Sequence, residues 1–215
     1  FSKKAIDLIY KDSNLKNITT DENFDTFSFS WYNNTDIDPA TGLTPYNNMQ
    51  KVLKVCHDFV DNFDTNFSNL LFIGQTGVGK TFLSNCIARA LMDSCHSIIY
   101  LTAGEFFDSF KSDDFKEFGS SKFDTSFFVE CDLLIIDDLG TEKASDYNFS
   151  NLFNTINERL LRRKSIIISS NLEMPDIETR YSQRIFSRLV SAYSILRLFG
   201  DDIRCMKKLS PTKRS

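Results

Sequence analysis

The sequence predicts an α/β fold in which a parallel sheet of five strands lies between two layers of helices. Short apolar runs recur along the chain at residues 69–74, 97–102, 132–138, 165–171 and 194–199. Continuous apolar runs are typical of strands that are buried on both faces of a sheet. The stretches between them place apolar residues at helical spacing, and strands that alternate with helices indicate βαβ units with parallel strands. We therefore expect a three-layer domain.

Length and composition fit one globular domain with flanking segments. The chain has 215 residues, 41% of them hydrophobic, which suffices for one core but not for two comfortable domains. Residues 1–45 are polar but carry aromatic side chains, and we expect an arm that lies over the core. The globular domain is expected at 46–206, with a first amphipathic helix at 46–63 whose first turn Pro45 suits, and a basic tail at 207–215. The sequence does not begin with methionine, which indicates a piece of a longer chain.

The composition excludes several classes of protein. A net charge of −4 and a pI near 5.3 exclude a uniformly basic nucleic-acid-binding surface, while leaving room for a local basic patch. No apolar run approaches the roughly 18 residues of a membrane span, and the first residues lack the apolar stretch of a signal peptide. We therefore expect no membrane contact and a cytoplasmic location. The five cysteines are scattered without a CxxC pair, and they predict neither a zinc site nor a disulfide framework.

A glycine-rich motif follows the first predicted strand. It fits the pattern G-x-x-x-x-G-K-[ST] and comprises Gly74, Gln75, Thr76, Gly77, Val78, Gly79, Lys80 and Thr81. Between a strand and a helix, such a loop binds phosphate, because backbone N–H groups and the helix N-terminus surround the phosphate oxygens. Lys80 is expected to reach the β- and γ-phosphates of ATP, and Thr81 to offer its hydroxyl to Mg²⁺. The alternative is a chance glycine-rich turn, which the flanking elements disfavour.

Polar residues also follow two of the later apolar runs. Residues 133–136 are apolar and lead to Asp137 and Asp138, the placement of a Walker B motif. Asp137 is expected to hold Mg²⁺, and Asp138 to orient and deprotonate the attacking water. Asn171 ends the fourth run, where its amide could hydrogen-bond the γ-phosphate and the lytic water. The alternatives are a loop cap for the aspartates and an ordinary turn residue for Asn171.

Several arginines near the end of the chain suggest anion binding. Arg184 and Arg188 are four residues apart on a predicted helix, and Arg204 follows the last predicted strand. Arginine suits a γ-phosphate, which a neighbouring subunit can contact in trans, while surface salt bridges are the alternative. The basic residues 162–164 are better explained as cations at a helix C-terminus, although a DNA contact stays open.

The ordered set of motifs resembles one clade of AAA+ ATPases, the bacterial helicase loaders of the DnaC/DnaI type with the related IstB transposition ATPases. The segments that carry the resemblance are the glycine-rich motif, LLIIDDLGTE at 133–142, SSN at 169–171, QRIFSRL at 183–189 and FGDDIR at 199–204. The likeness covers roughly residues 22–206. It implies a P-loop NTPase core of the AAA+ type without a separate helical lid domain.

By the same resemblance, Asn171 looks like the sensor 1 residue, Arg188 like the arginine finger and Arg204 like the sensor 2 arginine. The ATP site would then be completed between subunits of a homo-oligomer. The family loads a replicative helicase of the DnaB type onto single-stranded DNA, so these are the implied partners, with ATP and Mg²⁺ as cofactors.

Two departures and three alternatives bear on this interpretation. The chain ends soon after the fifth predicted strand, so we expect no separate helical lid domain, a feature that loaders of this clade commonly share. The position of the AAA+ catalytic glutamate holds Asp138, whose side chain is one methylene shorter, so turnover is expected to be slow and DNA-stimulated. An IstB-like transposition helper would share the core and differ mainly in its partner. A DNA-bound scaffold that binds ATP with little hydrolysis is a second alternative. A P-loop kinase is a third, but it would need a lid with substrate-binding arginines.

Overall fold

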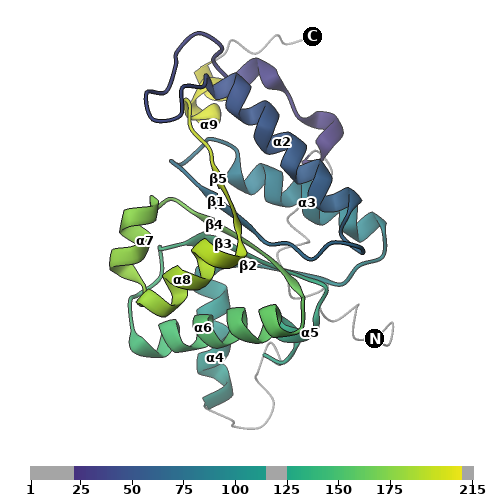
Figure 1. The fold of residues 1–215 in the computed structure, drawn as a ribbon, viewed down its shortest axis with the longest axis vertical. Coiled ribbons are helices and arrows are strands. Elements are labelled where there is room, and N and C mark those ends of the chain that lie inside the picture. Colours follow the sequence, from purple (N-terminus) through teal and green to yellow (C-terminus); the bar gives the residue numbers. More distant parts are fainter. Residues whose placement is uncertain (1–21, 115–124, 210–215) are drawn as a thin grey trace.

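The computed structural model describes residues 22–114 and 125–209, and it contains the expected parallel sheet. The strands lie in the order β2-β3-β4-β1-β5, and each neighbouring pair is parallel (Figure 1). They are β1 (Leu70–Ile73), β2 (Ile98–Thr102), β3 (Leu133–Leu139), β4 (Ser165–Ser170) and β5 (Ser194–Arg197). The predicted α/β fold class is confirmed.

Helices cover both faces of this sheet (Figure 1). One face carries α2 (Pro45–Asp61) and α3 (Lys80–Asp93). The other carries α4 (Ala103–Asp114), α5 (Phe127–Glu130), α6 (Asp146–Leu161), α7 (Met174–Arg180) and α8 (Gln183–Ala192). The strand order explains this division, because β1 and its neighbour β4 are followed by connections that run in opposite directions along the sheet. Such a switch point opens a crevice at the carboxyl ends of these two strands.

Side chains of the central strands alternate between the two faces. Leu71 and Ile73 of β1 pack against the layer of α4 to α8, whereas Leu70 and Phe72 pack against α2 and α3. The same alternation continues in β2, β3 and β4. Both faces of these strands are therefore apolar and buried, as the continuous apolar runs predict.

The fifth strand differs from the expectation of a strand buried on both faces. β5 lies at the edge of the sheet and pairs with β1. Ser194 is exposed, and 37% of Ile195 is accessible to solvent. The apolar run at 194–199 therefore belongs partly to an edge strand, and its buried Leu198 lies beyond the strand end.

Local capping signals agree with the observed helix starts. Thr44 precedes α2 and its hydroxyl accepts a hydrogen bond from the Asn47 backbone N–H at 3.2 Å, with Pro45 in the first turn. Before α4, the Thr102 backbone N–H donates to the Glu105 carboxylate at 2.8 Å, and the Glu105 N–H donates to the Thr102 hydroxyl at 3.3 Å.

Among the helices of residues 22–114 and 125–209, none has the length and apolarity to cross a membrane.

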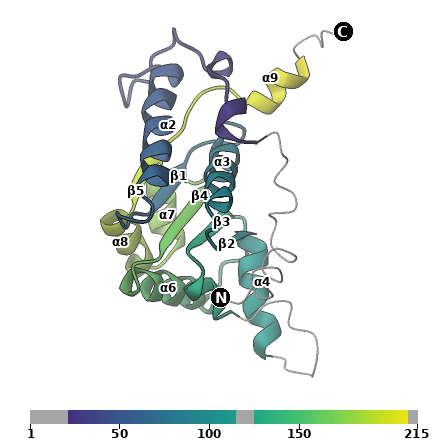
Figure 2. The same ribbon diagram turned by 90° about the vertical axis from the view of Figure 1, so that its right-hand side faces the viewer.

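The described part of the arm and the end of the chain lie side by side (Figure 2). Residues 22–44 contain two 3-10 helices, η2 (Phe24–Thr26) and η3 (Phe29–Trp31), whose aromatic side chains pack against the core cluster that includes residues of α2 and α3. The ammonium of Lys207 in α9 (Ile203–Leu209) lies 5.6 Å from the centre of the Trp31 ring. The expected tail at 207–215 is thus helical through Leu209, and residues 210–215 lie outside the described part of the chain.

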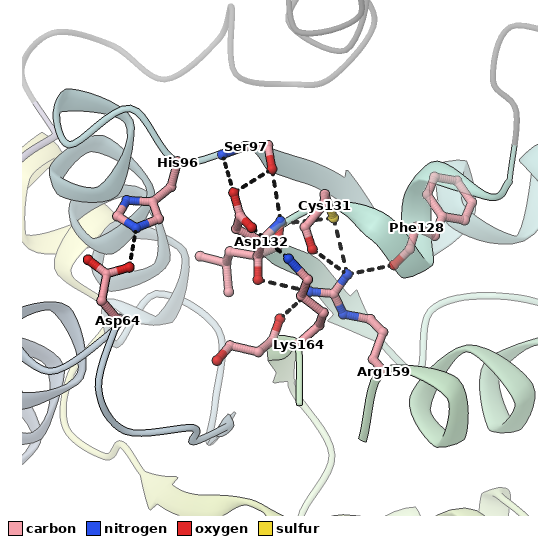
Figure 3. Close-up of polar contacts among 10 residues, drawn as sticks. Asp64, His96, Ser97, Phe128, Cys131, Asp132, Arg159 and Lys164 are labelled. Carbon is pink, nitrogen blue, oxygen red and sulfur yellow. Dashed lines mark hydrogen bonds and ion pairs between the residues drawn. The ribbon is translucent and has the colours of Figure 1, made fainter. Parts of the chain in front are cut away.

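A buried arginine joins elements at the amino ends of β3 and β4 (Figure 3). Arg159 of α6 is fully buried, and its guanidinium donates to four backbone carbonyls. The acceptors are Phe128 at 2.7 Å, Cys131 at 3.0 Å, Asp132 at 3.1 Å and Ser165 at 2.6 Å. The sequence does not distinguish this arginine from its exposed neighbours.

The adjacent basic residues 162–164 have local partners. Arg162 lies 3.8 Å from Glu158, and the Arg163 guanidinium lies 5.3 Å from the centre of the Phe67 ring. The ammonium of Lys164 donates to the Asp132 carboxylate at 2.7 Å, which ties the end of α6 to the start of β3 (Figure 3). This partner explains Lys164 better than its place at a helix C-terminus.

Candidate nucleotide-binding site

The glycine-rich motif forms the loop between β1 and the start of α3 at Lys80, as predicted. The backbone at Gly74 and Gly79 has φ values of 137° and 106°, a left-handed conformation that other residues rarely adopt. A Cβ atom on Gly74 would lie 1.9 Å from the carbonyl oxygen of Leu198, which follows β5. The loop therefore needs glycine there to pass the end of the edge strand.

Lys80 is folded back onto the loop that precedes it. Its ammonium donates to the carbonyls of Gly74 at 2.6 Å and Gln75 at 2.7 Å, and to the side-chain oxygen of Asn171 at 2.8 Å. Burial lowers the pKa of Lys80, and the carboxylates of Asp138 and Asp137 oppose that shift. The structure thus brings the lysine of one motif against the asparagine at the end of β4, across the crevice.

Asp137 lies at the centre of a cluster of hydroxyl groups. One carboxylate oxygen, Oδ2, accepts hydrogen bonds from Thr81 and from Tyr100, each at 3.0 Å. The other oxygen, Oδ1, accepts one from Ser169. Asp137 is buried, and Thr81 and Asp137 are therefore brought together as the sequence predicts.

Asp138 turns toward the crevice in an unusual backbone conformation. Its φ of 57° is left-handed, a conformation that costs a non-glycine residue about 1 kcal/mol or more and recurs at functional sites. The Asp138 N–H donates to the Ser169 hydroxyl at 2.9 Å, and the Asn171 amide donates to the Asp138 carboxylate at 3.4 Å. Burial and the neighbouring charge of Asp137 raise the pKa of Asp138, while Lys80 opposes the shift.

Several of these groups line a cavity of about 490 Å³ beside the phosphate loop. Polar lining residues are Thr76, Lys80, Thr81, Asp138 and Asn171, together with Gly77 and Gly79 of the loop. The lining also includes Phe27, Trp31 and Tyr32 of the arm, and Arg204 and Lys207 of α9. A cavity of this size, with both polar and aromatic residues in its lining, suits a nucleotide.

The remaining residues of the motif are placed in different ways. Thr76 lines the cavity, the Gln75 side chain is exposed and the Val78 side chain is buried in the core. The carbonyl of Val78 accepts a hydrogen bond from the Tyr32 hydroxyl at 3.3 Å, which attaches the arm to the loop. Val78 therefore contributes backbone atoms, and its side chain cannot contact a ligand in the cavity.

Arg188 lies outside the nucleotide-sized cavity. It borders a second, open hollow of about 360 Å³ on α8, together with Arg184, Gln183, Ser187 and Phe153 of α6. Its guanidinium donates to Asn157 at 3.3 Å and lies 5.9 Å from the centre of the Phe153 ring. Arg188 therefore has no place in the site of its own chain.

Arg204 lines the first cavity from α9, as its predicted role requires. Its backbone N–H donates at 2.9 Å to the carboxylate of Asp202, which also lies 3.8 Å from the guanidinium. The Ile203 N–H donates to the Gly77 carbonyl at 3.0 Å, so the start of α9 is attached to the phosphate loop.

Three site residues were missed by sequence reasoning: Tyr32, Tyr100 and Ser169. Tyr100 belongs to an apolar run that predicts a buried strand. Ser169 lies two residues before Asn171, and its position in the sequence does not indicate a hydrogen bond to an aspartate. The sequence offers one indication of these contacts. A hydroxyl side chain on a strand can reach an aspartate when that aspartate ends a neighbouring strand. Burial raises the pKa of Tyr100 well above its ordinary value, and the charge of Asp137 adds to the shift, so its phenol stays protonated and donates.

The chain is similar to proteins that are already known. A family model described as IstB-like ATP binding protein matches residues 44–210. The replicative helicase loader DnaC of Escherichia coli K12 is 24% identical over 151 residues, which are 70% of this chain and 61% of the loader.

Two solved structures share the fold. A crystal structure of the DnaC helicase loader aligns with a TM-score of 0.64 and 22% identity over 84% of this chain and 98% of that one. The AMPPCP-bound DnaA from Aquifex aeolicus aligns with a TM-score of 0.67 and 17% identity over 89% of this chain and 55% of that one. At these identities the structural matches show the fold alone, an α/β fold with a five-stranded parallel sheet.

Proposed function

Since the chain belongs to the family of IstB-like ATP binding proteins, we propose that it binds and hydrolyses Mg-ATP and loads a replicative helicase onto single-stranded DNA. The observation that carries the ATPase proposal is the convergence of Lys80, Asp138 and Asn171 on one cavity beside the phosphate loop. The loader role rests on the similarity to replicative helicase loaders, of whose length the chain spans about three fifths, 61% for the Escherichia coli protein.

The phosphates would lie over the loop of Gly74–Gly79 at the start of α3. Backbone N–H groups of such a loop and the positive end of the helix stabilise phosphate charge. Lys80 would exchange its carbonyl and amide partners for phosphate oxygens, which are stronger acceptors for an ammonium. Arg204 of α9, which lines the same cavity, would contact the phosphates as the sensor 2 arginine.

The residues beside the loop fit Mg²⁺. The Thr81 hydroxyl and the Asp137 carboxylate are 3.0 Å apart and offer oxygen atoms alone, the ligand type that this hard cation prefers. Thr81 and Asp137 would hold the ion, which would neutralise charge on the phosphate oxygens.

Asp138 and Asn171 would position the attacking water. The Asp138 carboxylate lines the cavity and accepts a hydrogen bond from Asn171, so the two side chains face the same space. An ionised carboxylate within hydrogen-bonding reach of water can take up its proton. The shorter side chain of aspartate, compared with glutamate, agrees with slow turnover.

Arg188 would act on the ATP of a neighbouring subunit. It lies outside the cavity of its own chain, in an open hollow of α8, and its contacts with Asn157 and Phe153 are weak ones. An arginine supplied in trans stabilises the charge of the transition state for phosphoryl transfer. We therefore propose a homo-oligomer whose ATP sites lie between subunits.

A complementation assay tests this arrangement. Lys80→Ala removes the phosphate contact of a subunit but leaves its Arg188, whereas Arg188→Ala leaves the cavity intact. Each variant alone is expected to be inactive, and an equimolar mixture should recover part of the ATPase activity. Arg184→Ala is the matched variant one helical turn away and is expected to retain activity. Full activity of Arg188→Ala on its own would contradict the trans mechanism.

A second experiment tests the loader role against the transposition helper. The family description favours the helper as the second candidate, because IstB-like proteins include it. The loader is expected to elute with a hexameric replicative helicase in the presence of ATP, and single-stranded DNA should raise its ATPase rate. Binding to a transposase instead of the helicase would favour the helper, and ATP binding without hydrolysis would favour the scaffold.

A further inference from the structure

The Asp137 carboxylate is surrounded by neutral donors. Its hydrogen bonds come from the hydroxyls of Thr81, Tyr100 and Ser169, which belong to α3, β2 and β4. Within residues 22–114 and 125–209, no ion pair reaches it, because the nearby Lys80 ammonium bonds to Gly74, Gln75 and Asn171 instead. The buried Asp137 carboxylate is thus held in place by hydroxyl groups and not by an ammonium or guanidinium.

We propose that Tyr100 and Ser169 are positioning residues that orient the Asp137 carboxylate toward Mg²⁺. This inference rests on the proposed Mg-ATP site and assigns two residues that support its metal ligand. Outer-shell hydrogen bonds of this kind fix the orientation of ligating carboxylates, and their loss typically weakens metal binding or activity about 10- to 100-fold.

The number of acceptor positions on the carboxylate supports this assignment. An ionised carboxylate has about four lone-pair sites, and the observed hydroxyls take two on Oδ2 and one on Oδ1. Roughly one site remains on Oδ1 for a metal ion or its water. A lysine or arginine partner would have oriented the carboxylate equally well but would have cancelled the charge that attracts a cation.

Ser169 also connects the two aspartates. Its hydroxyl donates to Asp137 and accepts the N–H of Asp138 at 2.9 Å, so it supports the left-handed backbone that turns Asp138 into the cavity. Tyr100 has no such second contact with the aspartates. Loss of Ser169 is therefore expected to affect both metal binding and hydrolysis, and loss of the Tyr100 hydroxyl mainly metal binding.

The test is the Mg²⁺ dependence of nucleotide binding in Tyr100→Phe, with the non-hydrolysable analogue AMPPCP as the probe. Affinity is measured by calorimetry in EDTA and across a Mg²⁺ titration. Tyr181→Phe is the control, because Tyr181 is a buried tyrosine that donates to another buried carboxylate, Glu142, at 2.6 Å outside the cavity. We expect Tyr100→Phe to need about 10-fold more Mg²⁺ than wild type, with equal affinity in EDTA. Tyr181→Phe should match wild type in both conditions.

Each other outcome overturns the inference. Equal losses with and without Mg²⁺, or the same loss in Tyr181→Phe, would mean that the Tyr100 hydroxyl serves stability alone. Ser169→Ala, a smaller change, is the second variant and must also raise the Mg²⁺ requirement. Asp137→Asn distinguishes failure of the positioning role from failure of the proposed metal site. If it alone alters the Mg²⁺ response, the metal site stands and the positioning role fails; if it does not, the proposed metal site is wrong as well.

Discussion

Replacing the buried Arg159 with methionine is expected to destabilise the fold strongly. Arg159→Met keeps much of the apolar stem but leaves the carbonyls of Phe128, Cys131, Asp132 and Ser165 without their donor. An orphaned buried acceptor costs about 1–3 kcal/mol, so the three buried carbonyls, with the partly buried one of Asp132, cost roughly 4 kcal/mol or more. Relief from burying the guanidinium offsets part of this, and we expect a net loss of about 3 kcal/mol or more.

Urea unfolding followed by circular dichroism measures the loss in free energy of unfolding, and thermal unfolding followed in the same way measures the change in melting temperature. In a chain of this size each kcal/mol shifts the melting temperature by about 2–4 °C, so the variant should melt about 10 °C lower. Arg162→Met at the end of the same helix is the control, because Arg162 is 54% exposed and lies 3.8 Å from its partner Glu158. It should change the free energy of unfolding by less than about 0.5 kcal/mol. A loss below about 1 kcal/mol in Arg159→Met would refute the reasoning.

Three further predictions concern backbone geometry, pH and chemistry. Gly74→Ala should abolish nucleotide binding and lower the melting temperature, because the new Cβ would lie 1.9 Å from the Leu198 carbonyl oxygen; normal AMPPCP affinity would contradict this. Burial would raise the pKa of Asp132, but hydrogen bonds from Lys164 and Ser97 outweigh it and lower that pKa from 3.8 to about 2. Its ionised form then stabilises the fold at neutral pH by roughly 1 kcal/mol after allowance for solvent screening. This contribution is lost as the pH falls from about 4 toward 2, so the deficit of Asp132→Asn in urea unfolding should shrink toward pH 3, and a constant deficit would exclude the linkage. Asp138→Asn should bind Mg-ATP with unchanged affinity but lose hydrolysis, as measured by phosphate release, and a variant that turns over at the wild-type rate would show that Asp138 is not the base.

The predictable parts of this protein are those written in local patterns. The strand runs, the phosphate loop and the start of α2 at Pro45 each depend on residues that are close together in the sequence. Asp137 and Asn171 could be placed near that loop because parallel strands end at the same edge of a sheet. Their roles in catalysis remain predictions.

The features that escaped prediction depend on contacts between distant residues. Tyr100 and Ser169 are 37 and 32 residues away from Asp137, and no spacing rule links a strand hydroxyl to a carboxylate on the next strand. Arg159 is one basic residue among several at a helix end, and its burial follows from how α6 packs on the sheet. The apolar run at β5 predicts a strand buried on both faces, because such a run does not indicate whether its strand lies at the centre or at the edge of the sheet.

We propose that one cavity binds Mg-ATP through Lys80 and hydrolyses it through Asp138. Phosphate release from ATP by the purified chain, measured with Mg²⁺ for wild type, Lys80→Ala and Asp138→Asn, together with AMPPCP affinity, tests it most directly. We expect hydrolysis by wild type, loss of both binding and hydrolysis in Lys80→Ala, and binding without hydrolysis in Asp138→Asn. Hydrolysis at the wild-type rate in either variant, or no AMPPCP binding by wild type, would contradict it.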